Sequence, residues 1–128
     1  DAQSKYDFEL NIEDELQKYE ISLNEELFER AVINLLNNAF RHNPDGCQVY
    51  INLYKENKKT ILEIGDGGSG VPDEILQRLN QNAYAETKSV GKHGLGLKIV
   101  KKVAAFHRWK VRFYNGEDVG FVCRMEIK

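Results

Sequence analysis

The stretch Glu25–Pro44, EELFERAVINLLNNAFRHNP, decides how the rest of the chain must be arranged. Apolar residues recur in it every three or four positions, which predicts one long amphipathic helix. Its apolar stripe has two adjacent rows, formed by Leu27, Ala31, Leu35 and Ala39 and by Phe28, Val32, Leu36 and Phe40. A stripe of this width must pack on another surface, most simply a β-sheet.

Three polar residues of this stretch, Asn34, Asn38 and Arg41, lie along one margin of the apolar stripe. At about 100° per residue they fall within an arc of roughly 60°. Asparagine is a poor helix former because its amide competes for backbone hydrogen bonds. The three side chains are either solvated or bonded to a neighbouring strand, or they serve a site at the edge of the core.

Size and charge limit the classes of protein to which the chain can belong. A chain of 128 residues, 41% apolar and 30% charged, is expected to form one globular domain over residues 1–128. Its net charge of −2 gives no broad positive field for nucleic acid. No apolar run approaches the roughly 18 residues of a membrane span, and no signal peptide opens the chain. Cys47 and Cys123 lack metal-site spacing and are expected to be buried thiols in a reducing compartment, although their pairing stays open.

The other elements follow from alternating polarity, turn residues and helix-starting residues. Strands are expected over Tyr6–Leu10, Tyr19–Leu23, Cys47–Glu56, Thr60–Ile64, Trp109–Tyr114 and Val119–Ile127, and further helices over Pro72–Asn80 and Gly94–His107. Asn24 is expected to cap the long helix, and Asn11–Lys18 to form a connector. Hairpin turns are expected at residues 57–59 and 115–118, and a mobile segment at Gln81–His93. Mostly antiparallel strands with all helices on one face make an α+β two-layer sandwich.

Two more stretches carry candidate chemistry beside the asparagine helix. Asp66-x-Gly68-x-Gly70 follows a strand, and Gly94-Leu95-Gly96-Leu97 begins a helix. A helix that starts in glycines exposes N–H groups that can hold phosphate. Asp66 can accept a hydrogen bond from an exocyclic amine such as that of adenine, and Asn38 offers an amide oxygen to a cation such as Mg²⁺. Each stretch alone has an ordinary structural explanation, as a tight turn, a cap or close packing.

Three segments in this order, NLLNNAFRHNP, DGGSGVP and HGLGLKIV, resemble the N box and the two glycine boxes of one family. It is the ATP-binding catalytic domain of two-component sensor histidine kinases, within the wider GHKL group of gyrase, heat-shock chaperones and mismatch-repair ATPases. The resemblance runs from about Tyr6 to the end of the chain. It implies the Bergerat fold, a mixed, mostly antiparallel sheet of about five strands covered on one face by three helices.

The resemblance also implies roles for individual residues. Asn38 would ligate Mg²⁺, Asp66 would bond the adenine amine, and Asn34 and Arg41 would act on the phosphate and metal side. His42 would stand beside the nucleotide, in place of an aromatic residue that the family often carries there. The remaining residues that would contact ATP are Gly68, Gly70, Lys88, Lys92, His93, Gly94, Leu95, Gly96 and Leu97.

Two departures from the family pattern concern the segment Gln81–His93, the expected lid over the nucleotide. The lid usually carries phenylalanines, whereas this segment offers Tyr84 alone as an aromatic residue. The second glycine box often reads GTGLGL, whereas Lys92 and His93 precede Gly94 here. The core of that box is nevertheless intact.

Asn34 separates the subfamilies of this group. The hydrolysing relatives and the anti-sigma serine kinases carry a glutamate four residues before the metal-binding asparagine, where it acts as general base. An amide cannot accept a proton at neutral pH, so Asn34 favours phosphoryl transfer to a histidine, which is itself a nucleophile. The alternatives are a catalytically impaired nucleotide-binding regulatory module and an anti-sigma-type serine kinase.

The acceptor histidine is not expected within this chain. None of His42, His93 and His107 has the family's acceptor context, and His107 follows an apolar helix face, which indicates packing. We therefore expect an excised, monomeric catalytic domain that lies on the cytoplasmic side of a membrane-anchored sensor kinase. Its expected partners are its own dimerisation and phosphoacceptor domain and a response regulator, with no nucleic acid.

Overall fold

The computed structural model describes residues 5–81, 94–117 and 120–127 of the chain. Five strands form one sheet: β1 (Tyr6–Ile12), β2 (Cys47–Glu56), β3 (Lys59–Asp66), β4 (Lys110–Asn115) and β5 (Phe121–Ile127). The helices are α2 (Glu25–His42), α3 (Asp73–Leu79) and α4 (Gly94–Phe106), with a short 3₁₀ turn, η1 (Asp14–Leu16).

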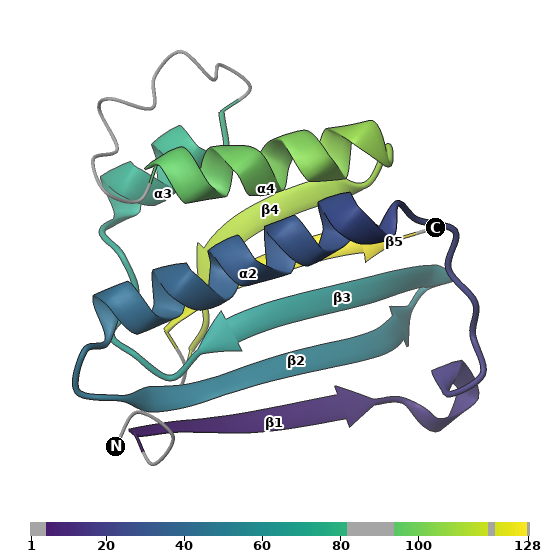
Figure 1. The fold of residues 1–128 in the computed structure, drawn as a ribbon, viewed down its shortest axis with the longest axis horizontal. Coiled ribbons are helices and arrows are strands. Elements are labelled where there is room, and N and C mark those ends of the chain that lie inside the picture. Colours follow the sequence, from purple (N-terminus) through teal and green to yellow (C-terminus); the bar gives the residue numbers. More distant parts are fainter. Residues whose placement is uncertain (1–4, 82–93, 118–119, 128) are drawn as a thin grey trace.

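The sheet has the order β1-β2-β3-β5-β4, and only its β1–β2 pair is parallel. Figure 1 shows α2, α3 and α4 on one face of this sheet, with α2 beside α4. The expected α+β two-layer sandwich with a mixed, mostly antiparallel sheet is therefore confirmed.

Helix α2 forms where the apolar periodicity predicts it. The Leu27 backbone N–H donates to Asn24 Oδ1 at 3.0 Å, so Asn24 is the N-cap, and Glu25 and Glu26 stand in the first turn. The row of Ala31, Leu35 and Ala39 is buried in the core as expected.

Helix α4 buries Leu97, Val100, Val103 and Ala104, which are at most 3% exposed. His107 follows it and stacks on Trp109, with ring centroids 4.3 Å apart. Its Nε2 accepts the Asn24 backbone N–H at 2.9 Å, so its Nδ1 carries the proton that faces the Val103 carbonyl at 2.8 Å. Both ring nitrogens are therefore engaged, in agreement with the predicted packing role.

The strand prediction for Tyr19–Leu23 is wrong. This segment forms no strand, and Ile21 and Leu23 instead pack against the edge of the core. Its alternation of polarity arises because a connector also has an inner and an outer side. Alternation alone does not separate that case from a strand.

Strand β1 forms where alternating polarity predicts it, and the same alternation is typical of a half-buried strand, but its two central apolar side chains face solvent. Phe8 is 61% exposed and Leu10 is 65% exposed, because β1 is an edge strand that the helices cover only in part, through the edge contact of Phe8 with Phe40 of α2. Tyr6, at the start of β1, donates its hydroxyl to the Asn43 carbonyl at 2.7 Å and so holds the strand to the end of α2.

The β2–β3 hairpin closes with two residues in the left-handed region, Asn57 at φ 55° and Lys58 at φ 81°, as a tight two-residue turn requires. Both cysteines are free: Cys123 is buried as expected, whereas Cys47 is half-buried. Burial raises the pKa of the Cys123 thiol. Among the described residues, no helix is long and apolar enough to cross a membrane.

A polar network lies on the helix-free face of the sheet. The hydroxyls of Tyr54 and Tyr114 both donate to Glu63 Oε2, at 2.9 and 2.7 Å. Arg124 Nη1 donates to the Tyr54 hydroxyl at 3.1 Å, and its Nη2 lies 2.6 Å from Glu56 Oε1. This face is therefore closed by internally bonded polar groups rather than by a second layer of helices.

Candidate functional site

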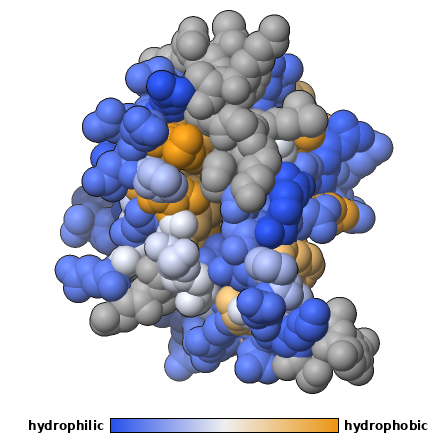
Figure 2. All heavy atoms as spheres, turned by 90° about the vertical axis from the view of Figure 1, so that its left-hand side faces the viewer, coloured by the Kyte–Doolittle hydropathy of each residue, from blue (hydrophilic) through white to orange (hydrophobic). Residues whose placement is uncertain are grey.

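A cavity of about 260 Å³ opens at the end of the molecule where α2 and β3 both terminate. Three parts of the chain line it: the last turn of α2 and its cap, the end of β3 with the loop that follows, and the start of β5. Figure 2 faces this end, where hydrophobic side chains show between mostly hydrophilic ones. The lining residues are Asn38, His42, Asn43, Asp66, Ser69, Gly70, Val71, Pro72 and Phe121.

Asn38 is a buried amide without a structural partner. It is 5% exposed, and its side chain makes no hydrogen bond within the described part of the chain. Its amide atoms are not among the fully enclosed polar atoms that lack a partner, so they remain accessible from the cavity that Asn38 lines. The amide is therefore free to meet a molecule that enters the cavity.

Asp66 is a buried carboxylate that the chain holds from three sides. It is 4% exposed, and Oδ1 accepts the Gly68 backbone N–H at 2.9 Å. Burial raises the pKa of Asp66, against the lowering effect of hydrogen bonds from the Gly68 and Phe121 backbones and the Asn43 side chain. A carboxylate has about four lone-pair positions, so three internal donors leave room for one more from a ligand.

Asn43 was not among the predicted site residues, although it lies in the quoted motif. It caps α2, and its Nδ2 donates to the Ala39 carbonyl at 2.8 Å while the same side chain bonds Asp66. Its role as a helix cap is typical of asparagine, so no separate signal in the sequence pointed to a contact with Asp66.

Gly68 and Gly70 were expected to let a ligand approach the backbone. In the structure, side chains of the chain itself lie against both glycines. A Cβ on Gly68 would lie 2.1 Å from Asn43 Oδ1, and one on Gly70, where φ is +81°, would lie 2.4 Å from Asn115 Oδ1. Two asparagine side chains therefore occupy the space that these glycines leave. Gly70 still lines the cavity, as expected.

The third motif approaches the middle of α2, one turn before the part of the helix that lines the cavity. A Cβ on Gly96 would lie 3.0 Å from Asn34 Oδ1, so the first turn of α4 touches α2 one helical turn before Asn38. The Asn34 Nδ2 donates to the Arg30 carbonyl at 2.8 Å, which leaves its oxygen toward Gly96. Two of the motifs therefore share one cavity, and the third lies beside it.

Several predicted site residues lie elsewhere or have a changed role. The side chain of Leu97 is fully buried in the core, which corrects its expected contact with a ligand and leaves only its backbone for that purpose. Arg41 is exposed and does not line the cavity. The backbone of Gly94 and Leu95 begins α4, and Lys88, Lys92, His93 and Tyr84 fall outside the described residues.

The walls of the cavity differ in character. Val71, Pro72 and Phe121 supply apolar surface, and Asn38 and Asp66 supply polar groups. An apolar planar ring with an exocyclic amine fits this combination. Since ligand sites usually span about 300–1,000 Å³, a cavity of about 260 Å³ has room for one ring system and a larger ligand would extend beyond it.

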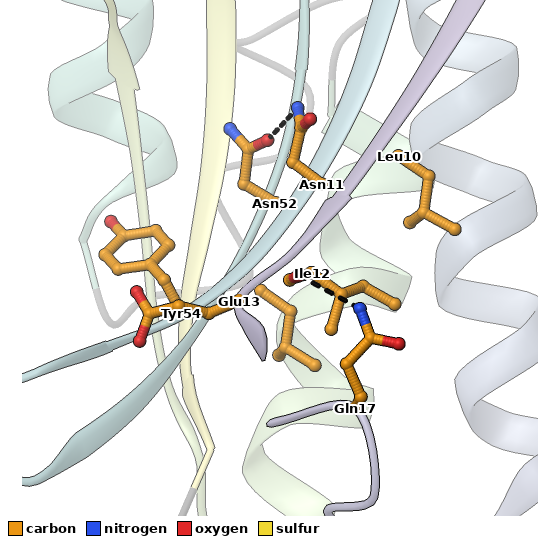
Figure 3. A pocket seen from close by; sticks show the side chains of 8 residues that line it. Leu10, Asn11, Ile12, Glu13, Gln17, Asn52 and Tyr54 are labelled. Carbon is orange, nitrogen blue, oxygen red and sulfur yellow. Dashed lines mark hydrogen bonds between the residues drawn. The ribbon is translucent and has the colours of Figure 1, made fainter. Parts of the chain in front are cut away.

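A larger cavity, of about 670 Å³, lies at the far end of β1 but lacks convergent chemistry. Figure 3 shows Leu10 and Ile12 on one side of β1 and Asn11, Asn52 and Tyr54 on the other. Asn11 Nδ2 donates to Asn52 Oδ1 at 2.9 Å, so these two lining side chains bond each other. Size alone therefore does not identify the functional site.

The donor set around Asn38 suits a cation that a ligand helps to hold. Within the described residues, no three His, Cys, Asp or Glu side chains group together as metal ligands. A single amide oxygen beside an open cavity matches the way Mg²⁺ is held through a few protein groups, water and phosphate oxygens.

Comparison with known proteins gives one consistent family. Residues 23–128 match the family model described as histidine kinase-, DNA gyrase B-, and HSP90-like ATPase. The chain is 29% identical over 111 residues to the sensor protein KdpD of Clostridium acetobutylicum, and 36% identical over 96 residues to the sensor protein QseC of Salmonella typhi. These matches cover 84% and 74% of this chain but only 12% and 20% of those proteins.

Solved structures agree with the sequence relatives. The mycobacterial sensor histidine kinase MprB superposes with a TM-score of 0.73 at 26% identity, over 97% of this chain and 82% of that one. The catalytic domain of the histidine kinase ThkA gives a TM-score of 0.77 at 20% identity, over 98% and 80%, which supports the fold alone.

Proposed function

The chain belongs to the histidine kinase-, DNA gyrase B-, and HSP90-like ATPase family, as a catalytic ATP-binding domain of the sensor histidine kinase type. We propose that it transfers the γ-phosphoryl group of Mg-ATP to a histidine on a separate dimerisation domain. In this proposal the phosphoryl group passes on to a response regulator, and the domain works on the cytoplasmic side of a membrane-anchored sensor.

One observation carries the proposal. Asn38 and Asp66, which lie far apart in the sequence, are both buried polar residues on one cavity, and each has bonding capacity that the described fold leaves unused. Asp66 would accept a hydrogen bond from the adenine amine, with the ring against Val71 and Phe121.

The phosphates would extend from the cavity along α2 toward α4. The first turn of α4, from Gly94, has N–H groups without helical partners, and the approach of Gly96 to Asn34 holds this turn beside α2. Asn38 would hold Mg²⁺ through its amide oxygen. The ion would supply neutralisation of charge on the phosphate oxygens.

The residue four positions before Asn38 supports transfer rather than hydrolysis. Asn34 donates to the Arg30 carbonyl and turns its oxygen to Gly96, and an amide does not act as a base for water. A neutral imidazole needs no such base, so the chain's own contribution would be positioning and charge neutralisation.

The deciding experiment supplies an acceptor histidine on a separate protein. The chain is mixed with labelled Mg-ATP and a purified helical hairpin domain that carries an acceptor histidine, with a hairpin lacking this histidine as control. We expect an acid-labile phosphohistidine on the intact hairpin alone. An acid-stable product would indicate a serine kinase, and ATP binding without any transfer would indicate a regulatory module.

A further inference from the structure

The side of the molecule formed by α4 and β4 is strongly basic. Residues 94–115 contain six cationic residues and no acidic one. A cavity of about 540 Å³ lies against the edge of β4, and it shares no lining residue with the cavity of Asn38 and Asp66. Its cationic lining residues are Lys101, Lys110, Arg112 and Arg124, and its acidic one is Glu126.

Two arginines of this cavity stand directly opposite each other. Arg112 on β4 pairs in register with Arg124 on β5, so both side chains project from the same face of the sheet. Like charges in directly opposite positions destabilise a sheet. The requirements of the fold therefore favour a neutral or acidic residue at position 112.

The nearby acidic groups are already engaged with other cations. Arg124 bonds Glu56 at 2.6 Å and lies 3.9 Å from Glu63. Glu126, the diagonal neighbour of Arg112, is 3.1 Å from Lys59. Glu63, which lies next to Arg124 on this face, also accepts hydrogen bonds from two tyrosines.

The side chains of Arg112 and Lys110 make no ion pair and no hydrogen bond within the described part of the chain. Lys101 differs, because its ammonium donates to the Leu79 carbonyl at 2.6 Å and so serves the fold. Lys110 stands directly opposite Glu126 in the register of β4 and β5, and that carboxylate also pairs with Lys59. Arg112 is therefore the cation of this cavity that no described contact explains, next to Arg124.

We propose that this cavity is a second, separate anion site that binds a phosphate group through Arg112 and Lys110. The planar guanidinium of Arg112 offers a fork of donors that matches two phosphate oxygens, and Lys110 adds a point charge two residues away on the same face. The bound dianion also removes the repulsion between Arg112 and Arg124. The source of the phosphate is either the free ion or a phosphomonoester on another molecule.

The test compares stability and binding in the same variants. Inorganic phosphate, O-phosphoserine and succinate are titrated at constant ionic strength, while backbone amide shifts are followed by NMR. We expect phosphate to shift the amides of residues 110–113 and to raise the melting temperature. Arg112→Gln should raise the melting temperature without phosphate by about 1–4 °C, and it should weaken phosphate binding at these amides at least tenfold.

Lys102→Gln is the matched control, since Lys102 is exposed on α4 and does not line the cavity. It should leave phosphate binding unchanged, and Lys110→Gln should weaken it. Tighter binding of O-phosphoserine than of phosphate would identify a phosphomonoester as the source, and the reverse would identify the free ion. Equal effects of succinate and phosphate, or a lower melting temperature of Arg112→Gln, would overturn the proposal. Shifts confined to residues 94–98 would also overturn it, since they report the nucleotide site.

Discussion

Replacing Asn43 by alanine tests whether its side chain positions Asp66. The amide donates one hydrogen bond to the Ala39 carbonyl and one to the Asp66 carboxylate. A neutral hydrogen bond is worth about 0.5–1.5 kcal/mol and one to a charged group about 1.5–3 kcal/mol, so Asn43→Ala should lower the free energy of unfolding by about 2–4.5 kcal/mol. A domain of this size has about 5–15 kcal/mol, so the variant stays folded.

The same change should alter ligand binding in a way that simple destabilisation does not. Loss of the Asn43 donor should raise the pKa of Asp66 further above its ordinary value. Protonated Asp66 no longer offers its ionised oxygen to the adenine amine, so ATP affinity falls as the pH falls through this pKa. In Asn43→Ala that fall should begin at a higher pH than in the wild type.

The assay combines urea unfolding with calorimetric titration of ATP between about pH 5 and pH 8. Asn37→Ala, exposed on the same helix, is the control and should change stability by less than about 0.5 kcal/mol. Tyr6→Phe removes the hydrogen bond to the Asn43 carbonyl but keeps the Asn43 side chain, so it should not move the pH profile. An unchanged profile in Asn43→Ala would refute the link between Asn43 and Asp66.

Four further outcomes are expected. Asn38→Ala should abolish Mg²⁺-dependent transfer in the hairpin assay without lowering the melting temperature, because its buried amide has no partner to lose; undiminished activity would reject its metal role. Asp66→Asn should weaken ATP binding and reduce its preference over GTP, measured by competition; retained discrimination would count against its contact with adenine. Gly96→Val should weaken ATP binding and lower stability, because its side chain would press against Asn34. Adding Asn34→Ala should restore stability in thermal unfolding but not the affinity for ATP. Normal ATP affinity in Gly96→Val would contradict phosphate binding at α4. Burial and Glu63 raise the pKa of Tyr54 to about 12, so the folded state holds this proton more tightly than the unfolded state. Stability should therefore fall as the pH rises from about 10 to about 12, and Tyr54→Phe should flatten this loss in urea unfolding; an equally steep loss would contradict it.

Local signals were sufficient where one segment alone determines its structure. The cap at Asn24 and the buried row of α2 depend on neighbours within one or two turns, so the periodicity of the sequence predicts them. The strand expected over Tyr19–Leu23 failed because alternation describes a connector equally well. The exposure of Phe8 and Leu10 could not be predicted, since it depends on which strand the helices cover only in part.

In the candidate site, too, local sequence predicted some features and tertiary packing decided the others. The three motifs proposed residues for a ligand site, and the structure places two of those residues, Asn38 and Asp66, on one cavity. Phe121 was missed because it enters the site only through the pairing of β5 with β3, which has no local signature. The glycines of the loop were assigned to a ligand, whereas Asn43 and Asn115 occupy the space beside them.

The sequence by itself determined the helix of Asn38, the family motifs and the identity of the polar groups, because these are properties of short segments. Only the tertiary structure decided that Asn43 holds Asp66, and that Arg112 faces Arg124 across two strands. Such contacts join residues that are distant in the chain. They depend on the order and register of the sheet, which the packing of the whole molecule fixes.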